Sequence, residues 1–163
     1  MSVDAPMSAA VARAESSGVE ELLAFEYALL RIVPRVEKGE SVNAGLLVYC
    51  RRLDFLGSET WVHRETVLAL DPEADLDGIA AAVRAYGRIC RGGIEAGPAG
   101  AGPVGQRFRW LTAPRSTVVQ PGPVHLGLTA DPLAELRRLA KRLSGRVRPA
   151  ETPDAASILG TGI

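Results

Sequence analysis

The chain has 163 residues, which is long enough for one domain with a substantial hydrophobic core and leaves little room for a second domain. Apolar residues make up 47% of the chain and charged residues 23%, a composition typical of soluble globular proteins. Lys and Arg together number 19, as do Asp and Glu, so no chain-wide electrostatic field is expected to attract nucleic acid or an acidic membrane.

The sequence shows neither a membrane span nor a secretory leader, because long apolar runs and a basic start before an apolar run are both missing. We therefore expect a cytoplasmic protein. Cys50 and Cys90 lie far apart within apolar patterns, which predicts reduced core thiols. With only two histidines in addition, we expect no metal site and no cofactor. The composition of residues 1–18 and 148–163 predicts flexible tails around one domain over 19–147.

The first regular elements form a predicted β-hairpin. Residues 25–35 and 42–52 are rich in β-branched and aromatic residues, and a polar connection that contains a glycine separates them. Both faces of the second run are largely apolar, which predicts a central strand covered on both sides. A third strand is expected over residues 59–63, after a short connector at 53–58.

The apolar period then changes to steps of three and four residues. This pattern predicts a helix over residues 75–91, capped by Asp75 or Asp77 and ended by Gly92. Residues 92–105 are too rich in Gly and Pro for regular structure, which indicates a mobile excursion or a lid. Residues 106–112 follow, and their expected core anchors are Phe108 and either Trp110 or Leu111.

A second helix is predicted over residues 131–144. Asp131 and Pro132 form a typical helix start, Gly145 ends the helix, and leucines every three or four residues form its apolar stripe. Its basic residues suit the negative end of the helix dipole, and aromatic residues are not interleaved with them, which argues against a nucleic-acid interface. Docking to an acidic protein surface explains the same patch, so the candidate partner-binding residues are Arg137, Arg138, Lys141 and Arg142.

The most polar stretch of the chain, TAPRSTVVQPGPVHLG, covers residues 112–127. Pro121 and Pro123 cannot donate to a β-ladder, so the segment must bend there or lie at a sheet edge. Beyond the prolines, alternation predicts a surface position for His125 and burial of the aliphatic residues Val124, Leu126 and Leu128. Before the prolines, a guanidinium and two hydroxyls suited to a phosphate or carboxylate come from Arg115, Ser116 and Thr117.

Residues 25–144 resemble a bacterial family known only as domain of unknown function family 3037. The resemblance rests on an Arg-x-x-Pro strand, a Gly-Glu-x-x-Asn-x-Gly hairpin and an Ala-Pro-Arg-Ser-Thr segment. One departure is Ala44, where relatives often have a β-branched residue. The family carries no assigned activity. Its members are encoded near kinases of the HipA-like class, so the resemblance implies a partner or regulator role. The matching polar residues are the candidate ligand-binding set: Arg31, Glu40, Asn43, Arg115, Ser116, Thr117, Gln120 and His125.

Together these patterns predict an α+β fold, a single domain with a mostly antiparallel sheet of four or five strands and two packed helices. The function expected first is that of an accessory or protein-binding module, with a kinase-like partner. The alternative is a small enzyme or ligand binder that holds an anionic compound through Arg115, Ser116 and Thr117, with His125 as proton donor or acceptor. Glu40 and Asn43 also have an ordinary explanation as a solvated side chain and a turn residue. A Ser116–His125 hydrolase has no third member and no nucleophile elbow.

Overall fold

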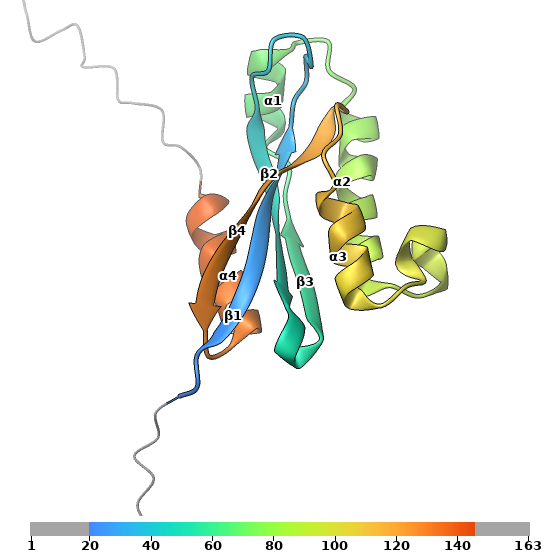
Figure 1. Ribbon diagram of the computed structural model, residues 1–163. Coiled ribbons are helices and arrows are strands. Elements are labelled where there is room, and N and C mark those ends of the chain that lie inside the picture. The colour runs from blue at the N-terminus through green and yellow to red at the C-terminus, as the bar shows by residue number, and fades with distance from the viewer. Residues whose placement is uncertain (1–19, 146–163) are drawn as a thin grey trace, which may run out of the picture.

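Four strands form one antiparallel sheet in the order β3-β2-β1-β4 in the computed structural model, which describes residues 20–145 (Figure 1). The strands are β1 (Leu23–Ile32), β2 (Val42–Cys50), β3 (Phe55–Thr60) and β4 (Val119–Thr129). The predicted α+β class is therefore confirmed. The predicted tails, residues 1–18 and 148–163, lie outside the described residues.

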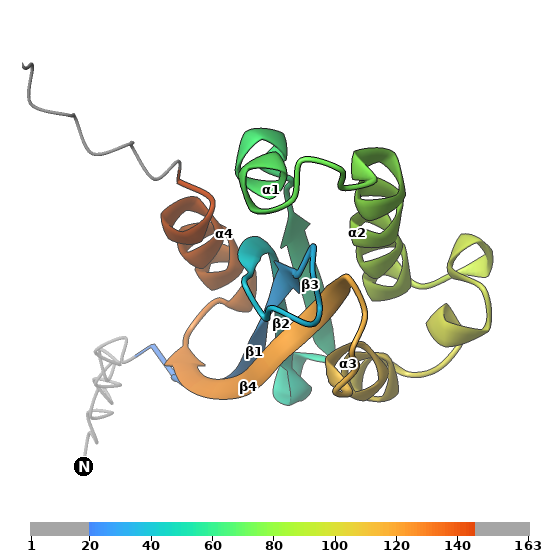
Figure 2. The same cartoon turned by 90° about the horizontal axis from the view of Figure 1, so that it is seen from above.

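Helices cover both faces of this sheet. They are α1 (Arg64–Leu70), α2 (Leu76–Arg91), α3 (Val104–Thr112) and α4 (Pro132–Leu143). In both views α4 lies on one side of the sheet, and α2 and α3 lie on the other (Figure 2). None of the helices within residues 20–145 is long and apolar enough to cross a membrane. The sequence predicted α2 and α4, whereas α1 and α3 were not predicted.

The sheet separates two hydrophobic cores. On the α2 and α3 side, buried residues such as Leu30, Leu47 and Phe108 pack together, and on the α4 side Phe25 and Val48 pack with residues of α4. Every residue of β2 from 44 to 50 is buried. The prediction that the second strand is central and covered on both faces is therefore confirmed.

The predicted hairpin is also confirmed, but the third strand begins earlier than expected. β2 pairs with β1 from Val42 to Tyr49, with one register shift, and β3 follows after a 3-10 turn at Arg51–Leu53. Asp54 adopts a left-handed conformation with φ 48°, which lets the chain reverse at once, so the expected connector becomes the strand. Of the strand expected at 59–63, only residues 59 and 60 belong to β3, because pairing ends near Trp61, whose backbone N–H donates to the Ala44 carbonyl.

Both predicted helices begin at the expected caps. The Asp75 carboxylate accepts a hydrogen bond from the Gly78 N–H at 2.9 Å and starts α2. The Asp131 carboxylate accepts from the N–H groups of Leu133 and Ala134 and starts α4. These local contacts satisfy donors that the first helical turn leaves free, which is why the sequence located them correctly.

The glycine-rich segment after α2 is more regular than predicted. Two 3-10 turns, Ile94–Ala96 and Pro98–Gly100, lead into α3, which begins within the last two residues of that segment and continues through residues 106–112. Phe108 and Leu111 are fully buried because a three-residue spacing places them on one helical face. Trp110, the alternative anchor, is 45% exposed.

β4 is an edge strand that also bends at its prolines, as expected. The register against β1 shifts between Ala28 and Leu30, and Gly122 and Pro123 are the residues that lack partners there. His125 is exposed as predicted, but the burial predicted for its aliphatic neighbours was wrong. Alternation does place these aliphatic side chains on one face of the sheet. No described helix covers that part of the face, so the side chains of Val124, Leu126 and Leu128 are exposed.

Candidate functional site

A cavity of about 780 Å³ lies at the β4 edge of the sheet, and we call it the edge pocket. Its walls come from the end of β1, the segment between α3 and β4, and the bulged first half of β4. Two arginines supply the charge, and no acidic side chain from the described part of the chain lines the cavity. The lining residues are Arg31, Thr112, Pro114, Arg115, Ser116, Gln120, Pro121, Gly122, Pro123 and Val124.

Arg31 reaches this pocket because of irregular strand pairing. The register shifts on both sides of β1 near this residue, between Leu30 and Arg31 against β2 and between Ala28 and Leu30 against β4. Bulges of this kind redirect side chains and are frequent beside binding sites. The Arg31 Nε is buried and finds no hydrogen-bond partner in the described part of the chain. A buried donor without an acceptor is costly, so this nitrogen favours a bound acceptor.

Gly122 lies beside the Arg31 guanidinium. A Cβ at this glycine would lie 3.5 Å from the Arg31 Nε and 3.4 Å from the Leu29 carbonyl oxygen. The backbone of β4 therefore passes close to the guanidinium, and Gln120 stands opposite Arg31 in the ladder. The bulged part of β4 thus brings its backbone and the Gln120 amide side chain next to the Arg31 guanidinium.

Arg115 is held in place by its own segment. Its guanidinium donates to the carbonyl of Trp110, and its Nε donates to the carbonyl of Ala113 at 3.3 Å. The same guanidinium lies over the Trp110 ring, 4.5 Å from the ring centre. These contacts leave other N–H groups of the guanidinium available, so Arg115 presents a positioned donor rather than a freely moving charge.

The structure brings part of the predicted ligand-binding set together. Arg31, Arg115, Ser116 and Gln120 all line the edge pocket, and Asn43 is the ladder neighbour of Arg31 on its other side. Glu40 is an exposed residue of the hairpin loop, so it does not join this group.

Thr117 and His125 also lie outside the lining of the edge pocket. The Thr117 hydroxyl donates to the Val119 carbonyl at 2.7 Å, which occupies its hydrogen in local structure. The His125 ring packs on the Tyr27 ring with 5.1 Å between their centres. The polar groups that do line the pocket are guanidinium, hydroxyl and amide donors, which suit an anion.

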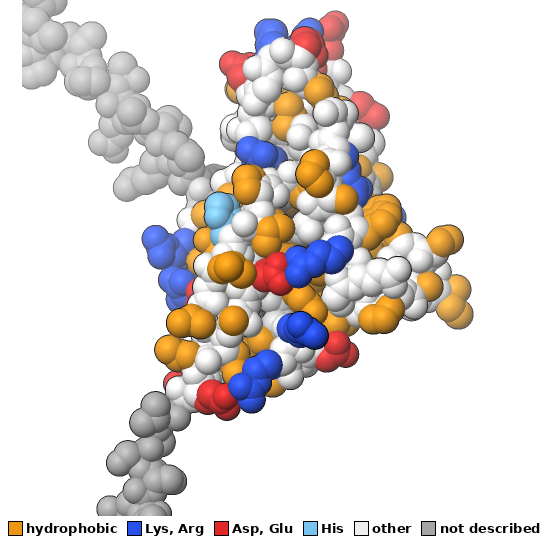
Figure 3. All heavy atoms as spheres, viewed as in Figure 1, with side chains coloured by type: hydrophobic (Ala, Val, Ile, Leu, Met, Phe, Trp, Pro, Cys, Tyr) orange, Lys and Arg blue, Asp and Glu red, His pale blue; other side chains and the backbone are white. Residues whose placement is uncertain are grey.

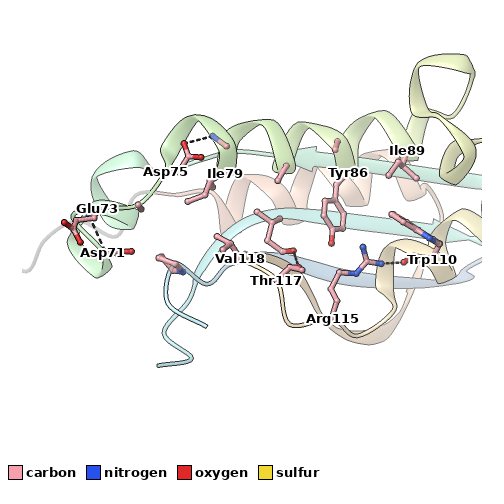
Figure 4. Close-up of a pocket in the computed structure, with 16 residues that line it drawn as sticks. Asp71, Glu73, Asp75, Ile79, Tyr86, Ile89, Trp110, Arg115, Thr117 and Val118 are labelled. Atoms are coloured by element: carbon pink, nitrogen blue, oxygen red, sulfur yellow. Dashed lines mark hydrogen bonds between the residues drawn. The ribbon is translucent and has the colours of Figure 1, made fainter. Parts of the chain in front are cut away.

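A second cavity, of about 530 Å³, runs along α2 and was not foreseen from the sequence (Figure 4). We call it the α2 groove. Apolar residues of α2 and of the segment before β4 form its floor, and the carboxylates of Asp71, Glu73 and Asp75 stand at one end. Figure 4 shows Tyr86 reaching from α2 toward Arg115, away from these carboxylates. Arg115 also lines the edge pocket, so it borders both cavities.

Tyr86 lines this groove from α2, within the helix that the sequence predicted over residues 75–91. Its hydroxyl is buried without a hydrogen-bond partner among the described residues. Burial raises the pKa of this hydroxyl above its ordinary value, and the positive charge of Arg115 acts against that rise. A signal for the groove does exist in the sequence, because small residues leave space along one side of α2: Gly78, Ala82 and Ala85.

Both cysteines are free and buried, in agreement with the prediction of core thiols. Burial raises the pKa of the Cys90 thiol to about 11, so it is protonated at neutral pH and a poor nucleophile. Within residues 20–145, no three His, Cys, Asp or Glu side chains are grouped so that they could hold a metal ion.

Fold and site together define an α+β domain with a basic pocket at the edge of an antiparallel sheet. The family model described as protein of unknown function DUF3037 matches residues 27–143, and the chain belongs to this family. The match covers nearly the same stretch as the resemblance noted from the sequence motifs. No curated protein and no solved structure was found to match the chain.

Proposed function

We propose that this protein is a ligand-binding module whose edge pocket holds the phosphate or carboxylate group of a small molecule. The observation that carries the proposal is the Arg31 guanidinium. Among residues 20–145, no acidic side chain lines its cavity and no acceptor meets its buried Nε. An anionic oxygen would satisfy that donor. Hydrogen bonds to charged groups are the strong ones, and arginine suits planar or tetrahedral anions particularly well.

Three neighbouring groups support the same ligand class. Arg115 adds a second guanidinium that is already oriented by its contacts with Trp110. Ser116 offers a hydroxyl on the same wall. The Gln120 amide donates to the Thr117 carbonyl at 3.0 Å with one N–H, and its second N–H is available to a ligand. Prolines and Val124 form the remaining wall, so the anionic group should be attached to an apolar body.

The test uses inorganic phosphate and acetate as probes, with binding measured by titration calorimetry and thermal shift at constant ionic strength. We expect Arg31→Ala and Arg115→Ala each to weaken phosphate binding about 10- to 100-fold, the equivalent of one charged hydrogen bond at about 1.5–3 kcal/mol. Arg31→Lys keeps the charge but removes the planar donor, so it should recover only part of the affinity.

The matched control is Arg51→Ala, an exposed arginine in the turn between β2 and β3 that lines neither cavity. It should leave phosphate binding unchanged. If Arg51→Ala weakened binding as much as Arg115→Ala, the effect would be general electrostatics and the pocket assignment would fail. Absence of any response of the native protein to phosphate, acetate or larger phosphates and carboxylates would remove the proposal altogether.

A second candidate, which we also propose, is a protein-binding role for the outer face of α4. Arg137, Lys141 and Arg142 are exposed and form no ion pair with any other residue between 20 and 145, whereas Arg138 pairs with Glu135 through two hydrogen bonds. Basic side chains stand out on the side of the molecule where α4 lies (Figure 3). Such a patch would complement an acidic partner, and a HipA-like kinase is the partner that the family resemblance suggests.

For this candidate, the measurement is co-purification at native expression level. A stoichiometric partner should be recovered with the native chain and lost with the double variant Arg137→Glu, Arg142→Glu, because reversing rim charges opposes association. Arg51→Glu serves as the control for a charge reversal elsewhere. Recovery of the native chain alone would contradict the candidate.

A further inference from the structure

The outer edge of β4 is open along its second half. Within residues 20–145, no backbone hydrogen bond outside the β1 ladder involves positions 124–128. Natural sheet edges are normally guarded by charged residues, prolines, bulges or covering helices. The prolines and the bulge guard only the first half of β4, and the rest of the strand carries no Asp, Glu, Lys or Arg. This half-edge can therefore accept another strand.

The opposite edge of the sheet is guarded. β3 is shorter than β4 and carries exposed Glu59, and α2 and α4 both contact it. The β3 edge is thus covered and charged, whereas the second half of the β4 edge is neither. This difference points to β4 as the strand that can pair with a strand of another molecule.

The unguarded half of β4 also exposes aliphatic side chains. Leu126 is 78% exposed, Leu128 65% and Val124 40%. They occupy alternate positions on one face, and Leu126 stands opposite Glu26 of β1. Figure 3 shows hydrophobic side chains gathered at the surface along β4 and β1. A contiguous apolar row on an open strand edge is a feature of interaction surfaces.

We propose that the occupant of this edge is a second copy of the chain, paired antiparallel through β4 about a two-fold axis at Leu126. In this register Leu126 faces Leu126 of the second copy, and Val124 faces Leu128 of the second copy. The apolar row is therefore complementary to itself, as a two-fold interface requires. The strand has no charged side chain that would be repelled by its own copy, and the whole chain is neutral at pH 7.

The other face of β4 has the same self-complementarity. A Cβ on Gly127 would lie 2.5 Å from a Phe25 ring carbon, so that ring lies over the glycine. In the proposed register, His125 of the second copy stands opposite Gly127, so its ring would pack against the Phe25 ring that covers the glycine. His125 of each copy is thus paired with Gly127 of the other copy, on both sides of the two-fold axis.

The proposed pairing has a natural end. Pro123 would stand opposite Thr129 of the second copy, and because proline has no N–H, the ladder stops there. Pro123 and Val124 also line the edge pocket, so the second copy would approach the rim of that pocket. The pairing itself does not rest on anion binding, since its evidence lies in the open strand and its side chains.

Sedimentation velocity over a range of concentrations tests the dimer. A short strand interface predicts a monomer–dimer equilibrium in the micromolar range. Leu126→Lys should shift the chain to monomer throughout that range, because two charges would meet at the axis. Leu53→Lys is the matched control, since Leu53 is 54% exposed in the turn at the opposite edge of the sheet. A native chain that is monomeric at all concentrations, or a dimer unaffected by Leu126→Lys, would overturn the proposal.

Disulfide cross-linking tests the register. Leu126→Cys places two thiols directly opposite each other, with Cβ atoms about 4.5–5.5 Å apart, and should give a covalent dimer under mild oxidation. Leu128→Cys alone places them four residues apart, about 13 Å, and should not. Native Cys50 and Cys90 are buried and give little background. Equal cross-linking of both variants, or none with Leu126→Cys, would refute this arrangement.

Discussion

Replacing Phe108 by alanine is expected to lower the free energy of unfolding by about 3–5 kcal/mol, the usual cost of removing a buried aromatic side chain. Phe108 is fully buried and stacks on Tyr49 of β2 with ring centres 5.0 Å apart. It is the main anchor of α3 on the sheet, and the Arg109 guanidinium lies 5.3 Å from its ring centre. Loss of the ring leaves a cavity between helix and sheet that the surrounding core can fill only partly.

Urea unfolding followed by circular dichroism measures this loss. The control is Gln106→Ala, an exposed position in the same helix, where alanine should change stability by only a few tenths of a kcal/mol. Because α3 leads directly to the segment that carries Arg115, the Phe108 variant should also weaken phosphate binding at temperatures where it is still folded. A loss below about 1 kcal/mol would show that α3 is not anchored by this ring.

Replacing Gly45 by alanine is expected to cost about 1–3 kcal/mol, the range observed when a methyl group is forced into a packed core. Gly45 lies in β2, and a Cβ there would be 2.8 Å from the Glu59 carbonyl oxygen and 3.3 Å from the Leu30 Cβ. The Glu59 oxygen belongs to the backbone of β3, so it can move away only if the pairing of β2 with β3 is distorted.

Gly87→Ala provides the matched control for this prediction. In α2, a Cβ at Gly87 would meet its nearest atom, Arg91 Nη1, at 3.5 Å, which is an ordinary contact. Alanine is also the better helix former, so this change should be neutral or stabilising by up to about 1 kcal/mol. A loss of stability in urea unfolding for Gly45→Ala, with no loss for Gly87→Ala, would support close approach of the backbones at Gly45. Equal effects would contradict it.

The arrangement of the edge pocket depends on details of pairing that a local pattern does not contain. The sequence identified Arg31, Arg115, Ser116 and Gln120 as polar candidates, and all four line the cavity. They become neighbours only because β1 and β4 pair antiparallel, with Arg31 opposite Gln120. The sequence did not indicate that His125 would instead pack on Tyr27, because the bulge decides which side chains reach the pocket.

The sequence by itself determined the features of this protein that depend on neighbouring residues. These are the hairpin of β1 and β2, the capped helices α2 and α4, and the interruption of β4 by its prolines, all of which follow from dihedral preferences, caps and apolar period. Alternation in β4 also grouped Val124, Leu126 and Leu128 on one face correctly.

Only the tertiary structure decided whether that face is covered. The two-residue repeat of a strand shows which side chains point to the same face of the sheet. Whether those side chains are buried depends on a helix from elsewhere in the chain packing over them. Here α3 packs on β2 and β4 and leaves the row on β4 exposed. The groove beside α2 and the environment of the Arg31 Nε, which has no partner between residues 20 and 145, arose in the same way, because both depend on surfaces brought together from distant parts of the chain.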